Sequence, residues 1–127
     1  MRLILVRHAE AAPGRPDALR SLTPAGRAVA RELAGRLARE RPDAVLSSPL
    51  LRARETAAPI AEAAGVDLET DERLAPGAEL DDVREALAGH GETAVVVAHQ
   101  PDCSEIVFAL TGREVRFPPG GTCEVEL

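Results

Sequence analysis

Short apolar runs alternate along the chain with longer segments in which apolar residues recur every third or fourth position. A wholly apolar run predicts a strand buried on both faces, and the longer pattern predicts a helix with one buried face. Strands are expected at 3–6, 44–47, 66–69 and 93–98, with one or two edge strands in the tail at 114–117 and 122–127. Helices are expected from Thr23-Pro24 to just before Pro42, and over 51–64, 79–88 and 100–110. This alternation from end to end is typical of a layered α/β domain.

The residues at the helix ends support these bounds. Thr23 is expected to cap the free N–H groups of the first helix, and Pro24 suits its first turn. Gly65 is expected to end the second helix. Pro59 lies inside that helix and predicts either a kink or a shifted start.

Length, charge and aromatic content narrow the classes of protein. At 127 residues and without an internal repeat, the chain is expected to form one domain over residues 1–127. The net charge is −6, and Phe108 and Phe117 are the only Phe, Tyr or Trp residues. No basic stripe offsets this charge and no aromatic surface could stack bases, so a nucleic-acid partner is not expected. The cationic side chains are all arginines, which excludes a lysine nucleophile or Schiff base.

Cysteine spacing and the length of the apolar runs exclude further classes. Cys103 and Cys123 form neither a CxxC pair nor a metal-ligand spacing, so they are expected to be reduced, structural thiols. The chain shows no signal-peptide pattern and no apolar run long enough to cross a membrane. We therefore expect a cytoplasmic protein without a membrane partner.

Four residues that can bind or attack phosphate lie just beyond predicted strands. Arg7-His8 follows the first strand, Arg52 lies shortly after the second, and His99 follows the strand at 93–98. Ligands of open α/β sheets bind beyond the carboxyl ends of the strands, so these side chains are expected to form one cationic pocket.

The four residue types match the needs of phosphoryl transfer. An imidazole such as that of His8 can attack phosphorus and form a phosphoramidate that water later cleaves, provided that the attacking nitrogen is unprotonated. Arg7 and Arg52 can clamp the equatorial oxygens, where the charge of the transition state is spread. His99 can donate to a phosphoryl oxygen when it is protonated.

Four segments resemble motifs of the histidine phosphatase superfamily, which includes the phosphoglycerate mutases. In order along the chain they are LVRHAE at 5–10, LTPAG at 22–26, SSPLLRARETA at 47–57 and VVAH at 96–99. The resemblance implies a phosphoglycerate mutase-like three-layer sandwich, with a mostly parallel central sheet flanked by helices.

The same resemblance implies roles for single residues. His8 would accept the phosphoryl group, and Arg7, Arg52 and His99 would form the phosphate pocket, with no metal and no organic cofactor. Ala9 stands where the family often has Gly. The same substitution is familiar in the SixA-like phosphohistidine phosphatase branch. This chain also resembles that branch in its short length and in the run from His99 to Pro101.

A departure from the family concerns the general acid. Many phosphomonoesterases and mutases of the superfamily carry a Glu between the third strand and the next helix, and Pro76 stands at the position we align with it. The possible acids are Glu72, Glu79 and Asp81, each of which is expected to be a solvated surface residue. Protonating an alkoxide leaving group is worth about 10²- to 10⁴-fold in rate, whereas an imidazole leaves more readily. A site without a dedicated acid therefore favours P–N substrates.

We therefore predict a metal-independent phosphatase that hydrolyses phosphohistidine on a protein through His8. The expected partner is a phosphorylated protein, since no segment is long enough for a large lid over the pocket. Two alternatives remain: a phosphomonoesterase that acts on a small phosphate ester with a nearby carboxylate as acid, and a non-catalytic module that binds phosphate or phosphoproteins.

Overall fold

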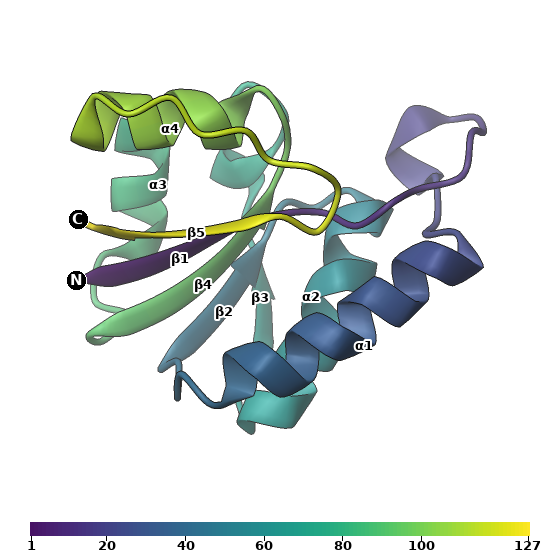
Figure 1. Ribbon diagram of the computed structural model, residues 1–127, viewed down its shortest axis with the longest axis horizontal. Coiled ribbons are helices and arrows are strands. Elements are labelled where there is room, and N and C mark those ends of the chain that lie inside the picture. The colour runs from purple at the N-terminus through teal and green to yellow at the C-terminus, as the bar shows by residue number, and fades with distance from the viewer.

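A five-stranded sheet forms the centre of the computed structural model, which describes all residues from 1 to 127 (Figure 1). Its strands are β1 (Arg2–Arg7), β2 (Ala44–Ser47), β3 (Leu68–Thr70), β4 (Thr93–Ala98) and β5 (Thr122–Glu126). The order across the sheet is β3-β2-β4-β1-β5, and only β5, at one edge, runs antiparallel to its neighbour. The expectation of a mostly parallel sheet is confirmed.

Two pairs of helices cover the two faces of the sheet. The helices are α1 (Pro24–Ala38), α2 (Leu51–Ala64), α3 (Leu80–Leu87) and α4 (Asp102–Thr111), with short 3₁₀ turns η1 (Asp17–Leu19) and η2 (Glu72–Leu74). Figure 1 shows α1 and α2 on one side and α3 and α4 on the other. Alternate residues of β1 point to opposite faces: Ile4 and Val6 pack with α1 and α2, and Leu3 and Leu5 pack with α3 and α4. This is the three-layer sandwich that the motifs implied.

The parallel register aligns the ends of the central strands. Arg7 at the end of β1 is paired with Ala98 at the end of β4. The ladder continues one step further, because the backbone N–H of His8 donates to Ala98 O at 3.1 Å and that of Ser48 donates to Val97 O at 3.0 Å. The segments that carry the predicted site residues therefore leave the sheet side by side.

The loop after β1 is held against the start of α1. Thr23 caps the helix as predicted, since its hydroxyl accepts a hydrogen bond from the backbone N–H of Gly26 at 2.9 Å. The backbone N–H of Thr23 donates to Glu10 O at 3.0 Å. A Cβ atom at position 26 would lie 2.2 Å from that carbonyl oxygen, so only glycine allows this approach.

Several expected bounds differ from the structure. No strand forms at 114–117, because carbonyl groups there bond to side chains instead: Val115 O accepts from Ser104 and Phe117 O accepts from Arg7. The third strand begins at Leu68 rather than at Val66, whose N–H closes the end of α2 on Ala61 O. α4 begins two residues later than expected, at Asp102.

α2 has the predicted bounds, with Gly65 in the left-handed conformation at its end (φ 73°). It continues through Pro59 and begins at Leu51, so the expected shift of its start does not occur. Contacts with α1 and the sheet hold this helix together despite the missing N–H of the proline.

Both cysteines are free thiols. Cys103 is fully buried in the core, and this burial raises its pKa to about 12. No helix combines the length and the apolar character that crossing a membrane requires.

Candidate active site

The structure brings the predicted histidines together at the carboxyl edge of the sheet. His8 follows β1 and His99 follows β4, and their ring centroids lie 5.3 Å apart with the planes tilted by 58°. Arg7 ends β1, and Arg52 is the second residue of α2. The charges of Arg52 and Arg7 both act on His8, so all four predicted residues belong to one electrostatic cluster.

His8 is held as a neutral imidazole with one free nitrogen. Its Nδ1 lies 2.8 Å from Ala9 O, so Nδ1 carries the proton and donates it to this carbonyl. Burial lowers the pKa of His8 below its usual value, and the charges of Arg52 and Arg7 lower it further, against the raising effect of the Ala9 bond. The Nε2 lone pair is therefore available at neutral pH.

His99 is buried and neutral in the free protein. Its Nε2 lies at hydrogen-bond distance, 2.7 Å, from Ser48 Oγ, and this oxygen accepts a hydrogen bond from the backbone N–H of Leu50 at 3.2 Å. Burial, followed by electrostatic interactions with His8 and with the charge of Arg52, lowers the pKa of His99 to about 4. Donation from His99 to a phosphoryl oxygen, as suggested by the sequence, therefore requires that His99 first be protonated.

Each arginine is anchored on one side by an acceptor from a distant segment. Arg7 NH1 donates to Phe117 O at 2.9 Å. Arg52 donates from NH1 to Asp17 O at 3.0 Å and from NH2 to Asp17 Oδ2 at 3.2 Å. Fixed acceptors of this kind set the direction of a planar guanidinium.

Two buried side-chain polar atoms have no hydrogen-bond partner, and both belong to the predicted site. They are Arg7 Nε and His99 Nδ1. A buried polar atom without a hydrogen-bond partner is costly, and in native proteins it calls for an explanation such as a bound ligand. An oxyanion bound at this site would supply an acceptor to Arg7 Nε, and to His99 Nδ1 when that nitrogen is protonated.

Thr56 links the loop after His8 to α2. Its hydroxyl accepts from the backbone N–H of Ala9 at 3.0 Å and donates to Arg52 O at 2.8 Å. Thr56, Ser48 and Asp17 all hydrogen-bond at the site, and the sequence marks none of them, because each bonds to a residue from another segment. The one available signal was that Ser48 and Thr56 lie inside the motif at 47–57.

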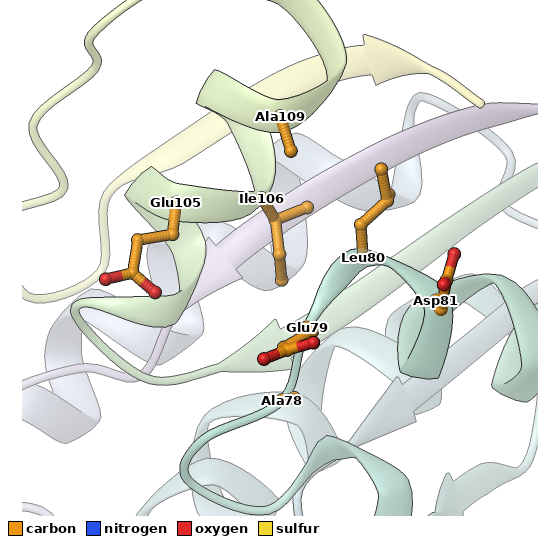
Figure 2. A pocket seen from close by; sticks show the side chains of 7 residues that line it. All are labelled: Ala78, Glu79, Leu80, Asp81, Glu105, Ile106 and Ala109. Atoms are coloured by element: carbon orange, nitrogen blue, oxygen red, sulfur yellow. The ribbon is translucent and has the colours of Figure 1, made fainter.

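The three possible acids lie on the surface. Glu72 is an exposed residue of η2. Glu79 and Asp81 flank Leu80 at the start of α3 and line a separate pocket between α3 and α4, which also contains Glu105 (Figure 2). Asp81 pairs with Arg84 at 3.7 Å. None of the three hydrogen-bonds to a predicted site residue, and an acid role for them stays a prediction.

No group of three or more His, Cys, Asp or Glu side chains is arranged to hold a metal ion. His90, the remaining histidine, precedes β4 whereas His99 follows it, and its Nε2 is 2.7 Å from Glu69 Oε2.

Comparison with known families assigns the chain. Residues 3–76 match the model of the histidine phosphatase superfamily (branch 1), and this segment includes Arg7, His8 and Arg52. The chain belongs to the histidine phosphatase superfamily. It is a phosphatase of that type, as the motifs implied.

Solved structures of SixA proteins share this fold over most of their length. A protein assigned as the phosphohistidine phosphatase SixA of Agrobacterium tumefaciens is 30% identical, with a TM-score of 0.83 over 97% of this chain and 89% of that one. The protein histidine phosphatase SixA in complex with tungstate is 25% identical, with a TM-score of 0.88 over 100% of this chain and 88% of that one. The SixA-like character expected from the sequence is confirmed.

The fold is also similar to that of a mycobacterial phosphatase with a different substrate. The glucosyl-3-phosphoglycerate phosphatase in complex with VO3 is 20% identical, with a TM-score of 0.78 over 98% of this chain and 90% of that one. At this identity the likeness shows the shared fold alone. No curated protein matches the chain by sequence.

Proposed function

We propose that this histidine phosphatase hydrolyses phosphohistidine on a protein, with His8 as the nucleophile. One observation carries the choice of a P–N substrate. Asp17 supplies the only carboxylate that hydrogen-bonds to Arg7, His8, Arg52 or His99, and its partner among them is Arg52. The hydrogen bond from Arg20, together with the charge of Arg52, holds the pKa of Asp17 below its usual range, so this carboxylate is ionised and cannot serve as an acid.

Whether the reaction needs such an acid depends on the leaving group. An alkoxide needs a proton from the enzyme, which is worth about 10²- to 10⁴-fold in rate. An imidazole that leaves from phosphohistidine takes its proton from solvent. A cationic site without a protonated carboxylate thus supports cleavage of P–N bonds over P–O bonds.

The proposed reaction has two steps. First, the Nε2 lone pair of His8 attacks phosphorus, the P–N bond of the substrate breaks, and the imidazole of the substrate leaves and is protonated by solvent. Second, water attacks phosphorus, the bond from phosphorus to Nε2 breaks, and inorganic phosphate and neutral His8 are released. Arg7 and Arg52 stabilise the charge on the equatorial oxygens in both steps.

His99 and Arg7 complete the proposed phosphate site. Arg7 Nε and His99 Nδ1 are the unpartnered buried side-chain atoms, and a phosphoryl group offers acceptor oxygens to Arg7 Nε and to the protonated form of His99. The negative charge of that group also opposes the effect of His8 and Arg52 on the pKa of His99, so binding of the substrate favours protonation of His99.

The relatives support the same substrate class. A SixA protein of 30% identity is assigned as a phosphohistidine phosphatase. The rival function is hydrolysis of a small phosphate ester, which the shared fold of the mycobacterial enzyme also allows. That function requires an acid, and Glu72, Glu79 and Asp81 are the carboxylates that we predicted for it.

Turnover of a phosphohistidine protein, measured beside a panel of phosphate monoesters, tests this proposal. The wild-type chain is expected to consume phosphohistidine and leave the esters nearly unchanged, and His8→Ala is expected to abolish turnover. His90→Ala is the matched control, because that histidine is partly exposed, pairs with Glu69 and has no contact with the predicted site residues.

A combined variant distinguishes the phosphohistidine phosphatase from the phosphomonoesterase. Changing Glu72→Gln, Glu79→Gln and Asp81→Asn together is expected to leave phosphohistidine turnover intact. Efficient ester hydrolysis that this variant loses would establish the phosphomonoesterase instead. Binding of phosphate with turnover of neither class would establish a non-catalytic module.

A further inference from the structure

Asp17 lies between two arginines and contacts a different one with each carboxylate oxygen. Its Oδ1 accepts from Arg20 NH1 at 3.1 Å, and its Oδ2 accepts from Arg52 NH2 at 3.2 Å. The sequence motifs include Arg52 but not Arg20, which lies in the loop between β1 and α1. The free protein therefore contains an occupied two-arginine anion site at the edge of the cationic pocket.

The three side chains differ in their exposure to solvent. The Arg52 side chain is 9% exposed, that of Arg20 is 29% exposed, and that of Asp17 is 64% exposed. The carboxylate thus approaches the arginines from the solvent side, the side from which a substrate would also arrive. A carboxylate and a phosphoryl group both present paired oxygens to guanidinium groups.

Arg20 keeps a free donor and acts on the reacting histidine. Its Nε donates to Ala12 O at 2.9 Å and its NH1 bonds to Asp17, which leaves NH2 without a protein partner. The charge of Arg20 is also among those that lower the pKa of His8. Arg20 is therefore close enough to His8 for its charge to be felt where the phosphoryl group would bind.

We propose that Arg20 is a third phosphate-binding arginine, and that the phosphoryl group of the substrate replaces the Asp17 carboxylate between Arg20 and Arg52. The inference rests on the proposed function of this site and adds to it a binding residue and an internal competitor. Asp17 lies at the start of η1, a one-turn helix on the surface loop, so it can leave the arginines without disturbing the core.

The two residues should have opposite effects on anion binding. Arg20→Gln removes a donor and a charge, and is expected to weaken binding of tungstate by about tenfold, the usual effect of one charge-assisted hydrogen bond. Asp17→Asn removes the competing charge and is expected to tighten binding by about threefold, as for a partly exposed ion pair. Arg15→Gln is the matched control, because Arg15 is an exposed residue of the same loop, and its effect is expected to stay within about twofold through screening.

Titration calorimetry with sodium tungstate on the full chain measures these changes, with thermal unfolding of each variant beside it. If Arg20 and Asp17 only hold the loop together, both variants will weaken binding, and this result overturns the inference. An effect of Arg20→Gln no larger than that of Arg15→Gln overturns it as well. Should Arg20→Gln fail to fold, Arg20→Lys keeps the charge without the planar fork, and unchanged affinity in that variant counts against the inference.

The same titration distinguishes this inference from the proposed function. A wild-type chain that binds no tungstate contradicts the phosphate site itself. A wild-type chain that binds tungstate and turns over phosphohistidine, with Arg20→Gln behaving like the control, contradicts the role of Arg20 alone.

Discussion

His8 donates its Nδ1 proton to the carbonyl oxygen of the next residue, Ala9, over 2.8 Å. A neutral imidazole has one N–H, so this bond leaves the lone pair on Nε2. The Ala9 N–H is in turn held by Thr56, which connects the tautomer of His8 to α2. The choice between the two ring nitrogens, which the residue pattern left open, thus follows from a contact to the neighbouring backbone.

The first prediction concerns the intermediate. Rapid quenching during turnover is expected to trap one phosphoryl group on His8, attached to Nε2. Mass spectrometry locates the modified residue, and phosphorus NMR of the quenched protein distinguishes the two nitrogens. Label on Nδ1, or label that persists in His8→Ala, would contradict the mechanism.

The second prediction concerns stability at low pH. The pKa of His99 in the folded protein is about 4, below its usual value of about 6.5, so the unfolded chain binds more protons between these values. The stabilisation is complete above about pH 6.5 and is lost as the pH falls towards 4, by about 2 kcal/mol after allowance for partial solvation. Urea unfolding at several pH values measures this loss, and His99→Asn should flatten the profile.

The third prediction concerns Thr56. Thr56→Val leaves the buried Ala9 N–H without its acceptor, which is expected to reduce the free energy of unfolding by about 1–3 kcal/mol. Turnover should fall as well, because Ala9 positions His8 and Thr56 also contacts the backbone of Arg52. The control is Thr111→Val, a comparable change at the exposed end of α4. Equal effects of the two changes would refute this role.

The fourth prediction concerns the serine pair. Ser48→Ala removes the hydroxyl that holds His99 Nε2, and kcat is expected to fall by about tenfold or more because His99 loses its orientation. Ser47→Ala is the control, since that hydroxyl, equally buried, bonds only to Ser48 O. Steady-state kinetics of both variants measure this effect. A fall in kcat for Ser47→Ala but not for Ser48→Ala would contradict the prediction.

The fifth prediction compares two glycines of α1. Gly26→Ala places a Cβ atom 2.2 Å from Glu10 O, so it is expected to cost about 3 kcal/mol, at the upper end for overpacking. Gly35 has no neighbour within 4 Å of its potential Cβ atom. Gly35→Ala should therefore stabilise the helix by about 0.5–1 kcal/mol through backbone entropy. Thermal unfolding gives both values, and changes of the same sign would contradict the packing account.

The sequence by itself determined the local structure of this protein. The apolar run at 3–6 and the cap at Thr23 predicted elements that the structure contains, because the spacing of apolar residues and helix capping involve residues that are neighbours in sequence. Arg7-His8 and His99 could be placed at the sheet edge for the same reason, since each lies directly after a recognisable strand. The family motifs, too, are read from consecutive residues.

Only the tertiary structure decided which distant groups meet. Ser48 contacts His99 across 51 positions of the chain, and Asp17 contacts Arg52 across 35. The segment at 114–117, which has the composition of a strand, instead supplies acceptors to Arg7 and Ser104. These partners have no local sequence pattern, because the parallel register and the packing of loops over the sheet edge bring them together. The protonation states of His8 and His99 depend on the same packing, since burial is the largest cause of both lowered pKa values.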